Sequence, residues 1–173
     1  MENQKKINNK LLIQKFIYIF IKFIILLVIY LLFFKVIFNV KRVDTNNMSP
    51  SIKPGDLLFI NKLDKDYHVG DVVLVNHNEK KYFFRIVASS NQKVEIDDSG
   101  IVLVDDALEG YKTMYKTFKD LNSDINYPYT VLDSSFFLLN DNRDVDNDSR
   151  VFGSINKDDI IGKVVAKLQI RNF

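Results

Sequence analysis

At 173 residues the chain is long enough for one ordinary domain together with a membrane anchor. Its formal net charge of +2 is unevenly spread: residues 1–42 contain eight Lys and Arg and one acid, whereas the remainder contains 16 basic and 21 acidic residues. The part expected to fold is therefore acidic, which argues against nucleic-acid binding. The chain has no cysteine, and this excludes a disulfide framework, thiolate metal sites and a cysteine nucleophile.

Near its start the chain contains a long apolar run. Residues 16–34 read FIYIFIKFIILLVIYLLFF, with Lys22 as the single charge. About 20 apolar residues cross a bilayer as a helix, so we expect a transmembrane anchor over 16–38, with the Lys22 ammonium reaching toward the headgroups. The run exceeds the 7–15 apolar residues typical of a signal peptide, and no A-x-A-like cleavage site follows it. We therefore expect a retained anchor.

The charges that flank this run bear on its orientation. The basic residues Lys5, Lys6 and Lys10 favour a cytoplasmic N-terminus over residues 1–15, although Lys41 and Arg42 lie on the opposite flank. The acidic domain that follows Lys41 and Arg42 is large, and we expect it to be translocated across the membrane. The prediction is a single-pass protein of the cytoplasmic membrane with its N-terminus inside and residues 43–173 extracellular.

Beyond Val43 the pattern changes to short stretches rich in Val, Ile and Phe, which Gly and Asp separate. Such stretches predict strands. They lie at 57–63, 72–75, 81–88, 93–96, 101–104, 136–140 and 163–170. A hairpin turn is expected at residues 97–100. Residues 110–130 are expected to form an irregular insertion, since the helical period over 108–121 is weak. The fold class is mainly β: an N-terminal transmembrane helix and an antiparallel β domain.

Three segments stand out in this domain. The first box is residues 47–52 (NMSPSI), followed by Gly55 and Asp56. The second box is residues 70–73 (GDVV) leading to 84–87 (FRIV). The third box is residues 140–143 (NDNR) and 148–153 (DSRVFG). In this order, behind an N-terminal anchor, they resemble the signature boxes of type I signal peptidases and cover nearly the whole chain. The resemblance implies the β fold of that family and a structural role for Asp141, Asn142, Arg143, Asp148, Ser149 and Arg150.

The chain departs from the family pattern at the catalytic positions. Asn47 stands where the resemblance places the nucleophilic Ser, and Phe84 where it places the general-base Lys. Asp146 replaces a Ser that helps to hold that Lys. A Ser–Lys dyad needs an amine whose pKa is lowered by an apolar pocket. Phe84 suits such a pocket but accepts no proton, and an amide is a poor nucleophile, so we expect no catalytic residues.

Other residues offer weaker routes to chemistry. Ser49 and Ser51 flank the lost nucleophile, but no lysine accompanies them at the second-box position, so packing within the loop is favoured. His68 and His77 are the only histidines, and no spacing supports a triad. Residues 144–148 (DVDND) imitate the start of an EF-hand loop but lack the Gly and the bidentate Glu that such a loop needs. We expect an Asx-rich turn, no metal and no cofactor.

If catalysis is absent, the substrate cleft remains useful. In the family an extended peptide lies along strand edges beside the first two boxes, which is β-augmentation. We expect a peptide-binding or membrane-contact surface made by Met48, Ser49, Pro50, Ser51 and Ile52. Members without the dyad resemble accessory proteins encoded with pili in Gram-positive bacteria.

The leading hypothesis is therefore a non-catalytic assembly factor that binds pilin or sortase. The alternatives are an active peptidase with unconventional residues and a regulatory decoy that binds secreted precursors or an active sister peptidase.

Overall fold

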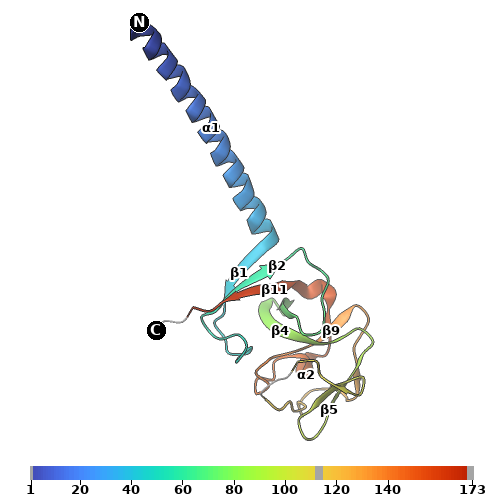
Figure 1. Cartoon of the computed structure of the whole chain (residues 1–173). Helices are drawn as coiled ribbons and strands as arrows, with labels where there is room; N and C mark the ends of the chain where they lie inside the picture. The colour runs from blue at the N-terminus through green and yellow to red at the C-terminus, as the bar shows by residue number, and fades with distance from the viewer. Residues whose placement is uncertain (1, 112–114, 171–173) are drawn as a thin grey trace. The chain divides into compact units, whose positions relative to one another are not determined.

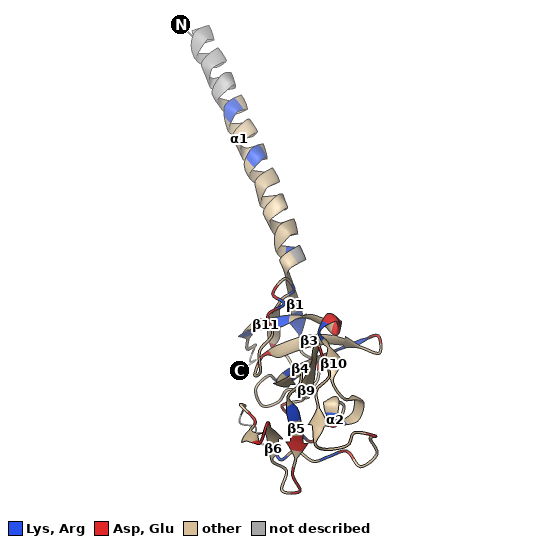
Figure 2. Cartoon of the chain, turned by 90° about the vertical axis from the view of Figure 1, so that its right-hand side faces the viewer, with Lys and Arg blue, Asp and Glu red and all other residues tan. Residues whose placement is uncertain are grey.

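The computed structural model describes residues 2–111 and 115–170 (Figure 1). The chain divides into two compact units, residues 1–38 and 39–173. The first unit is the helix α1, Glu2–Ile37. Within α1, Ile13–Lys35 has a mean hydropathy of 2.8 and is the one helix of the described residues that is long and apolar enough to cross a membrane. The expected apolar N-terminal helix is thus confirmed, and the basic residues drawn on it in Figure 2 interrupt it only sparsely.

The second unit contains two antiparallel sheets. The larger has seven strands in the order β1-β2-β11-β3-β4-β9-β10. Their bounds are Phe38–Arg42 (β1), Leu57–Asn61 (β2), Val72–His77 (β3), Lys80–Ser89 (β4), Ser135–Leu139 (β9), Ile155–Asn156 (β10) and Ile160–Leu168 (β11). The smaller sheet has the order β7-β6-β5-β8. Its strands are Lys93–Ile96 (β5), Val102–Val104 (β6), Ala107–Leu108 (β7) and Tyr129–Thr130 (β8). The short helix α2 covers Ser149–Phe152, and a 3-10 turn, η1, covers Lys157–Asp159.

The mainly β fold predicted from the sequence is confirmed. Each expected stretch overlaps a strand, and the turn at 97–100 joins β5 to β6. There the Asp97 carboxylate accepts hydrogen bonds from the backbone N–H groups of Ser99 and Ile101, as an Asx turn requires. Despite the weak helical period over 108–121, residues 108–111 and 115–121 contain no helix; residues 112–114 lie outside the described residues. Residues 115–128 are irregular before β8.

The partners of β4 position the site. Strand β4 pairs with β3 through residues 80–85 and with β9 through residues 85–89. Arg85 opposes Leu139, the last residue of β9, so β9 leaves β4 at this point. In the described residues, β3 is the only strand paired with residues 80–84; of these, Lys80 and Lys81 are exposed, residues 82 and 83 are partly buried, and Phe84 is 0% exposed.

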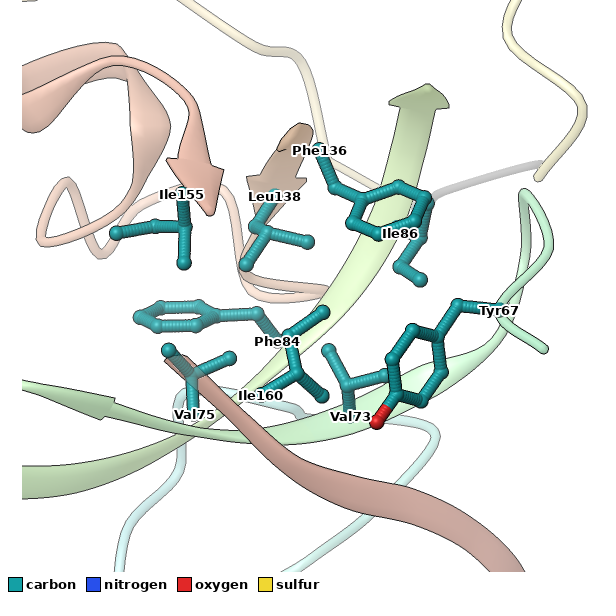
Figure 3. Packing of buried hydrophobic residues seen from close by; sticks show 9 residues of the cluster. All are labelled: Tyr67, Val73, Val75, Phe84, Ile86, Phe136, Leu138, Ile155 and Ile160. Atoms are coloured by element: carbon teal, nitrogen blue, oxygen red, sulfur yellow. The ribbon is translucent and has the colours of Figure 1, made fainter. Parts of the chain in front are cut away.

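Three clusters of buried apolar side chains fill the domain. The largest lies between the central strands and contains Tyr67, Val73, Val75, Phe84, Ile86, Phe136, Leu138, Ile155 and Ile160 (Figure 3). A second cluster joins β4 and β9 to the smaller sheet. The third lies under the first box and contains Val43, Met48, Ile52 and Leu58.

Candidate functional site

An arginine and an aspartate from different boxes form the centre of the site. Arg85 lies on β4 in the second box, and Asp141 follows β9 in the third. The guanidinium donates from Nε to Asp141 Oδ1 and from Nη2 to Oδ2, each at 2.6 Å. The two side chains are 9% and 1% exposed. Such bidentate, charge-assisted pairs have strict geometry, so this one fixes β4 against the chain that leaves β9.

Two more groups join this ion pair. The Ser51 hydroxyl contacts Asp141 Oδ2, lies 2.9 Å from the Met48 carbonyl oxygen and accepts from Arg85 Nη2 at 3.3 Å. Arg85 Nη1 donates to the carbonyl oxygen of Gly70 at 2.6 Å. All three boxes therefore meet at one point, which we call the box hub: Ser51, Gly70, Arg85 and Asp141.

Tyr111, from the irregular insertion, covers the hub. Its ring centroid lies 3.7 Å from Cζ of Arg85, a cation–π contact. Burial acts to lower the pKa of Arg85, but the hydrogen bonds and charge of Asp141 outweigh burial and raise it above its ordinary value. The hub therefore contains a permanently charged guanidinium.

Asn47, which stands where the family resemblance places the nucleophile, lies in a turn whose main chain is held by hydrogen bonds. The backbone N–H of Asn142 donates to the Asn47 carbonyl at 2.9 Å, and that of Ser49 donates to the Asn46 carbonyl at 3.0 Å. The Asn47 side chain is partly exposed, and it makes no hydrogen bond with the residues that the structure describes. The position therefore presents a free carboxamide in place of a nucleophile.

Two residues of the first box differ from expectation. Met48 and Ile52 are only 2% and 5% exposed, and they pack in the third core cluster. The Ile52 N–H donates to the Met48 carbonyl at 2.8 Å, which closes one helix-like turn and brings side chains four residues apart to the same side. Their expected role on a peptide-binding or membrane-contact surface is therefore corrected to a packing role. Pro50 is exposed, and Ser49 is partly exposed.

Phe84, which stands where the family resemblance places the general base, is buried. It is 0% exposed, and Figure 3 shows its ring beside Val75, Leu138, Ile155 and Ile160. Tyr82 and Phe152 add ring contacts at centroid distances of 5.8 and 5.9 Å. The apolar pocket inferred from the sequence is present, and a phenyl ring fills it.

The third box is a buried polar framework. Asp148 and Arg150 are 0% and 3% exposed, and their ion pair measures 2.9 Å from Nε to Oδ1. Arg150 also donates to the Arg143 carbonyl at 2.8 Å, and Asp148 accepts from the Asn140 N–H at 3.0 Å. Asp146, at the position of the missing Ser, is exposed. These bonds make the run 144–148 a tight turn between core elements.

Arg143 ties the insertion to this framework, a role that sequence reasoning missed. Its Nη1 donates to Thr117 Oγ1 at 2.8 Å and its Nη2 to Glu109 Oε2 at 2.9 Å. Burial raises the pKa of Glu109, and the charge and hydrogen bond of Arg143 offset this only in part. Neither Glu109 nor Thr117 belongs to a sequence motif. The sequence showed that the third box contains Arg143, but it gave no partner for this arginine. Glu109 and Thr117 are 34 and 26 residues away from it in the sequence.

In the part of the chain that the structure describes, neither Ser49 nor Ser51 has a hydroxyl hydrogen-bonded to a lysine or a histidine. The Ser51 hydroxyl is occupied within the box hub. Lys167 of β11 does approach Ser51, but its Nζ donates to the backbone carbonyl rather than to the hydroxyl. Within the described residues, no hydrogen bond joins a lysine amine to the hydroxyl of Ser49 or Ser51. This arrangement gives neither serine the activation that a nucleophile needs.

The histidines lie away from any serine contact in the described structure. His68 is 67% exposed and faces Asp66 and Asp71 at 3.7 and 4.0 Å. The His77 ring lies 4.3 Å from that of Phe152, centroid to centroid. Among the described residues, no group of three or more His, Asp or Glu side chains could hold a metal ion.

Comparisons with known proteins agree with this geometry. Residues 13–169 match the family described as "Signal peptidase, peptidase S26". "Inactive signal peptidase IA" of Staphylococcus aureus (strain COL) is 30% identical over 153 residues, which cover 82% of this chain and 85% of that protein. "Signal peptidase I P" of Bacillus subtilis subsp. natto is 30% identical over 132 residues, covering 69% of this chain and 71% of that protein.

A solved structure also matches. The crystal structure of a signal peptidase I from Enterococcus faecalis V583 aligns with a TM-score of 0.47 and 16% identity, and it covers 58% of this chain and 97% of that one.

Proposed function

The chain belongs to the signal peptidase family, peptidase S26, and we propose that it is a member that binds polypeptides without cutting them. The observation that carries this proposal is Phe84, whose ring fills the buried position at which the family resemblance places the general base. Asn47 stands at the nucleophile position. Removal of both members of a catalytic unit leaves at most the residual rate that positioning and electrostatics supply, roughly 10³–10⁴ over water.

The part of the site that the chain retains is its framework. The box hub joins all three boxes, and the Asp148–Arg150 pair orders the loop after β9. Burying so many charged groups needs good geometry, because an unpaired buried charge is strongly destabilising. In this proposal the framework holds the former substrate-binding surface in place while the chemistry is absent. The name of the Staphylococcus aureus relative supports the same reading.

Peptide binding is supported by the edge of β4 at residues 80–83, where β3 is the only pairing strand among the described residues and Lys80 and Lys81 are exposed. An edge of this kind offers main-chain N–H and C=O groups to an extended chain, which can add as a further strand. The first-box turn with Asn47 lies beside the end of β9, because Asn142 donates to it. The occupant that we propose is an extended polypeptide segment.

We place this activity at the outer face of the cytoplasmic membrane. The anchor expected over residues 16–38 is helix α1, which ends at Ile37; in this proposal residues 1–15 are cytoplasmic, and the β domain is extracellular on a Gram-positive cell. Confinement beside emerging substrates raises their effective concentration. The finer proposal is that the protein assists pilus assembly by binding pilin or the sortase that joins pilins; it rests on the resemblance to non-cleaving accessory members.

Site-specific crosslinking in cells tests this proposal. A photoreactive residue is placed at Lys81, exposed on the open stretch of β4, and in a matched control at Leu121, which is 94% exposed and lies in the insertion. We expect Lys81, and not Leu121, to capture an uncleaved secreted subunit or sortase. Equal capture from both positions, or capture of cleaved products only, would overturn the proposal.

A further inference from the structure

The smaller sheet has one buried face and one outer face. Val94 of β5 and Val102 of β6 are buried in the second core cluster. Because successive side chains of a strand point to opposite faces, Glu95 and Leu103 lie on the outer face. In the sheet register Glu95 pairs with Leu103, and Leu103 pairs with Leu108 of β7. These three side chains form a row across three strands, which we call the outer row.

Apolar side chains of the outer row are open to solvent. Leu108 is 72% exposed, and Leu103, its cross-strand neighbour, is partly exposed. Ile101, the residue before the buried Val102, is 44% exposed. Single exposed apolar side chains are common on protein surfaces, but groups of neighbouring ones are more typical of interaction sites. The outer row is therefore suited to contact with another apolar surface.

The smaller sheet also carries the negative charge of the domain. Residues 93–109 contain six acids and one lysine, whereas the rest of the chain after residue 42 contains 15 acids and 15 basic residues. Figure 2 shows acidic residues, in red, on β5 and on the turns beside it. The whole negative balance of the β domain thus lies around the outer row.

Two of these six acids are paired within the domain. Asp98 faces Lys119 at 3.5 Å, and Glu109 pairs with Arg143 at 2.9 Å. The other four form no salt bridge with the residues that the structure describes: Glu95, Asp97, Asp105 and Asp106. Their charge is therefore available to a partner, and Glu95 belongs to the outer row itself.

Hydrogen bonds keep two of these carboxylates ionised. The backbone N–H of Ile101 lowers the pKa of Asp97 below its ordinary value. The backbone N–H of Lys93 lowers the pKa of Asp105 in the same way. Anionic lipid surfaces attract basic segments and would repel this face. Charge complementarity instead favours a protein that carries Lys or Arg.

We propose that the outer row is a docking surface for a partner protein that presents Lys or Arg side chains beside apolar ones. The apolar contact is made by Leu103 and Leu108, and Glu95 with the neighbouring aspartates attracts the basic groups. This surface lies on a different sheet from the edge of β4, so its role goes beyond the proposed function and does not depend on it.

Peptide binding by the purified, full-length protein in neutral-detergent micelles tests this role. The probe is a short fluorescent peptide of alternating Lys and Leu, followed by anisotropy, and the comparison peptide has Glu in place of Lys. Micelles without protein give the blank. The variants are Glu95→Lys and Leu108→Ser. The matched controls are Asp158→Lys and Leu63→Ser, which make the same changes at exposed positions outside the smaller sheet.

We expect the wild type to prefer the Lys peptide, and a rise in NaCl from about 50 mM to about 500 mM to weaken this binding. Glu95→Lys should bind the Lys peptide about tenfold more weakly, because one attraction becomes a repulsion. Leu108→Ser should bind it about fivefold more weakly. Both controls should match the wild type. Glu95→Lys should also bind the Glu peptide more tightly than the wild type does, a gain that an unfolded variant would not give.

Three results would overturn the docking surface. The first is a wild type that binds the Lys peptide no better than the Glu peptide or the empty micelles. The second is equal weakening in the variants and their controls. The third is a dimer in sedimentation that Glu95→Lys converts to a monomer, which would show that a second copy of the chain covers this face. None of them bears on crosslinking from Lys81, so the proposed function stands or falls separately.

Discussion

Arg85 and Asp141 are 56 residues apart in sequence, yet they form two parallel hydrogen bonds of 2.6 Å inside the domain. This ion pair connects the second box to the third, and Ser51 adds the first. This charged, buried network joins the three boxes in a chain that has Asn47 and Phe84 where the family resemblance places the nucleophile and the general base.

Breaking the central ion pair should be costly. Asp141→Ala leaves the Arg85 guanidinium buried without its partner, and such a change destabilises by about 3–5 kcal/mol. Urea unfolding of the wild type and the variant measures this difference. The matched control is Asp98→Ala, since Asp98 is a fully exposed partner of Lys119 and its removal should change stability little. Equal midpoints for Asp141→Ala and the wild type would show that the pair is not important for stability.

Phe84→Lys should place an amine in the pocket of the missing base. Because the pocket is apolar and residue 84 is 0% exposed, burial lowers the pKa of the introduced lysine below its value in the unfolded chain. The unfolded state then binds more protons, so the stability of this variant should increase as pH rises through that range. Thermal melting from about pH 6 to pH 10 measures the trend, and Phe84→Leu serves as the control without a titrating group. A flat profile like that of Phe84→Leu would contradict a buried position.

Glu109 should make stability depend on pH in the opposite direction. Burial raises its pKa above the ordinary value of 4.5. The stability that its protonated form contributes is present below the unfolded pKa and is lost as pH rises through the folded pKa. The unfolding free energy of the wild type minus that of Glu109→Gln, which cannot titrate, should therefore fall as pH rises. Urea titrations at a series of pH values test this. A difference that grows with pH would mean that Arg143 dominates over burial.

The orientation of the anchor can be measured cleanly, because the chain has no cysteine of its own. Asn9→Cys introduces a single thiol before the apolar run in the sequence, and Asn122→Cys introduces one after it. A membrane-impermeant maleimide applied to intact cells should label position 122 and not position 9, and permeabilised cells should show both. Labelling of position 9 alone would reverse the proposed topology.

The sequence predicted the strands and boxes well because both depend on local pattern. Stretches rich in Val, Ile and Phe become buried strands, and the Asp97 turn uses bonds within four residues. The strands that were not predicted include β7, β8 and β10, each two residues long. Such short strands exist through their partners in the sheet and have no periodicity of their own.

The candidate site was predicted less completely. The burial of Met48 and Ile52 follows from one helix-like turn, and their spacing of four residues was the available signal. The contacts of Tyr111 and Thr117 with arginines of the boxes join an irregular segment to distant residues. No pattern within a segment encodes such pairing, because it depends on how the tertiary fold brings the segments together.

The central claim is that this signal-peptidase relative does not cut, and a cleavage assay tests it most directly. The purified full-length protein is incubated with a secreted precursor that an active relative cleaves, and the products are identified by mass spectrometry. We predict intact precursor, and the same result for Asn47→Ser, because residue 84, where the family resemblance places the general base, is a phenylalanine that accepts no proton. Cleavage by the native chain that disappears in Ser49→Ala or Ser51→Ala would contradict the account and make one of those serines the nucleophile.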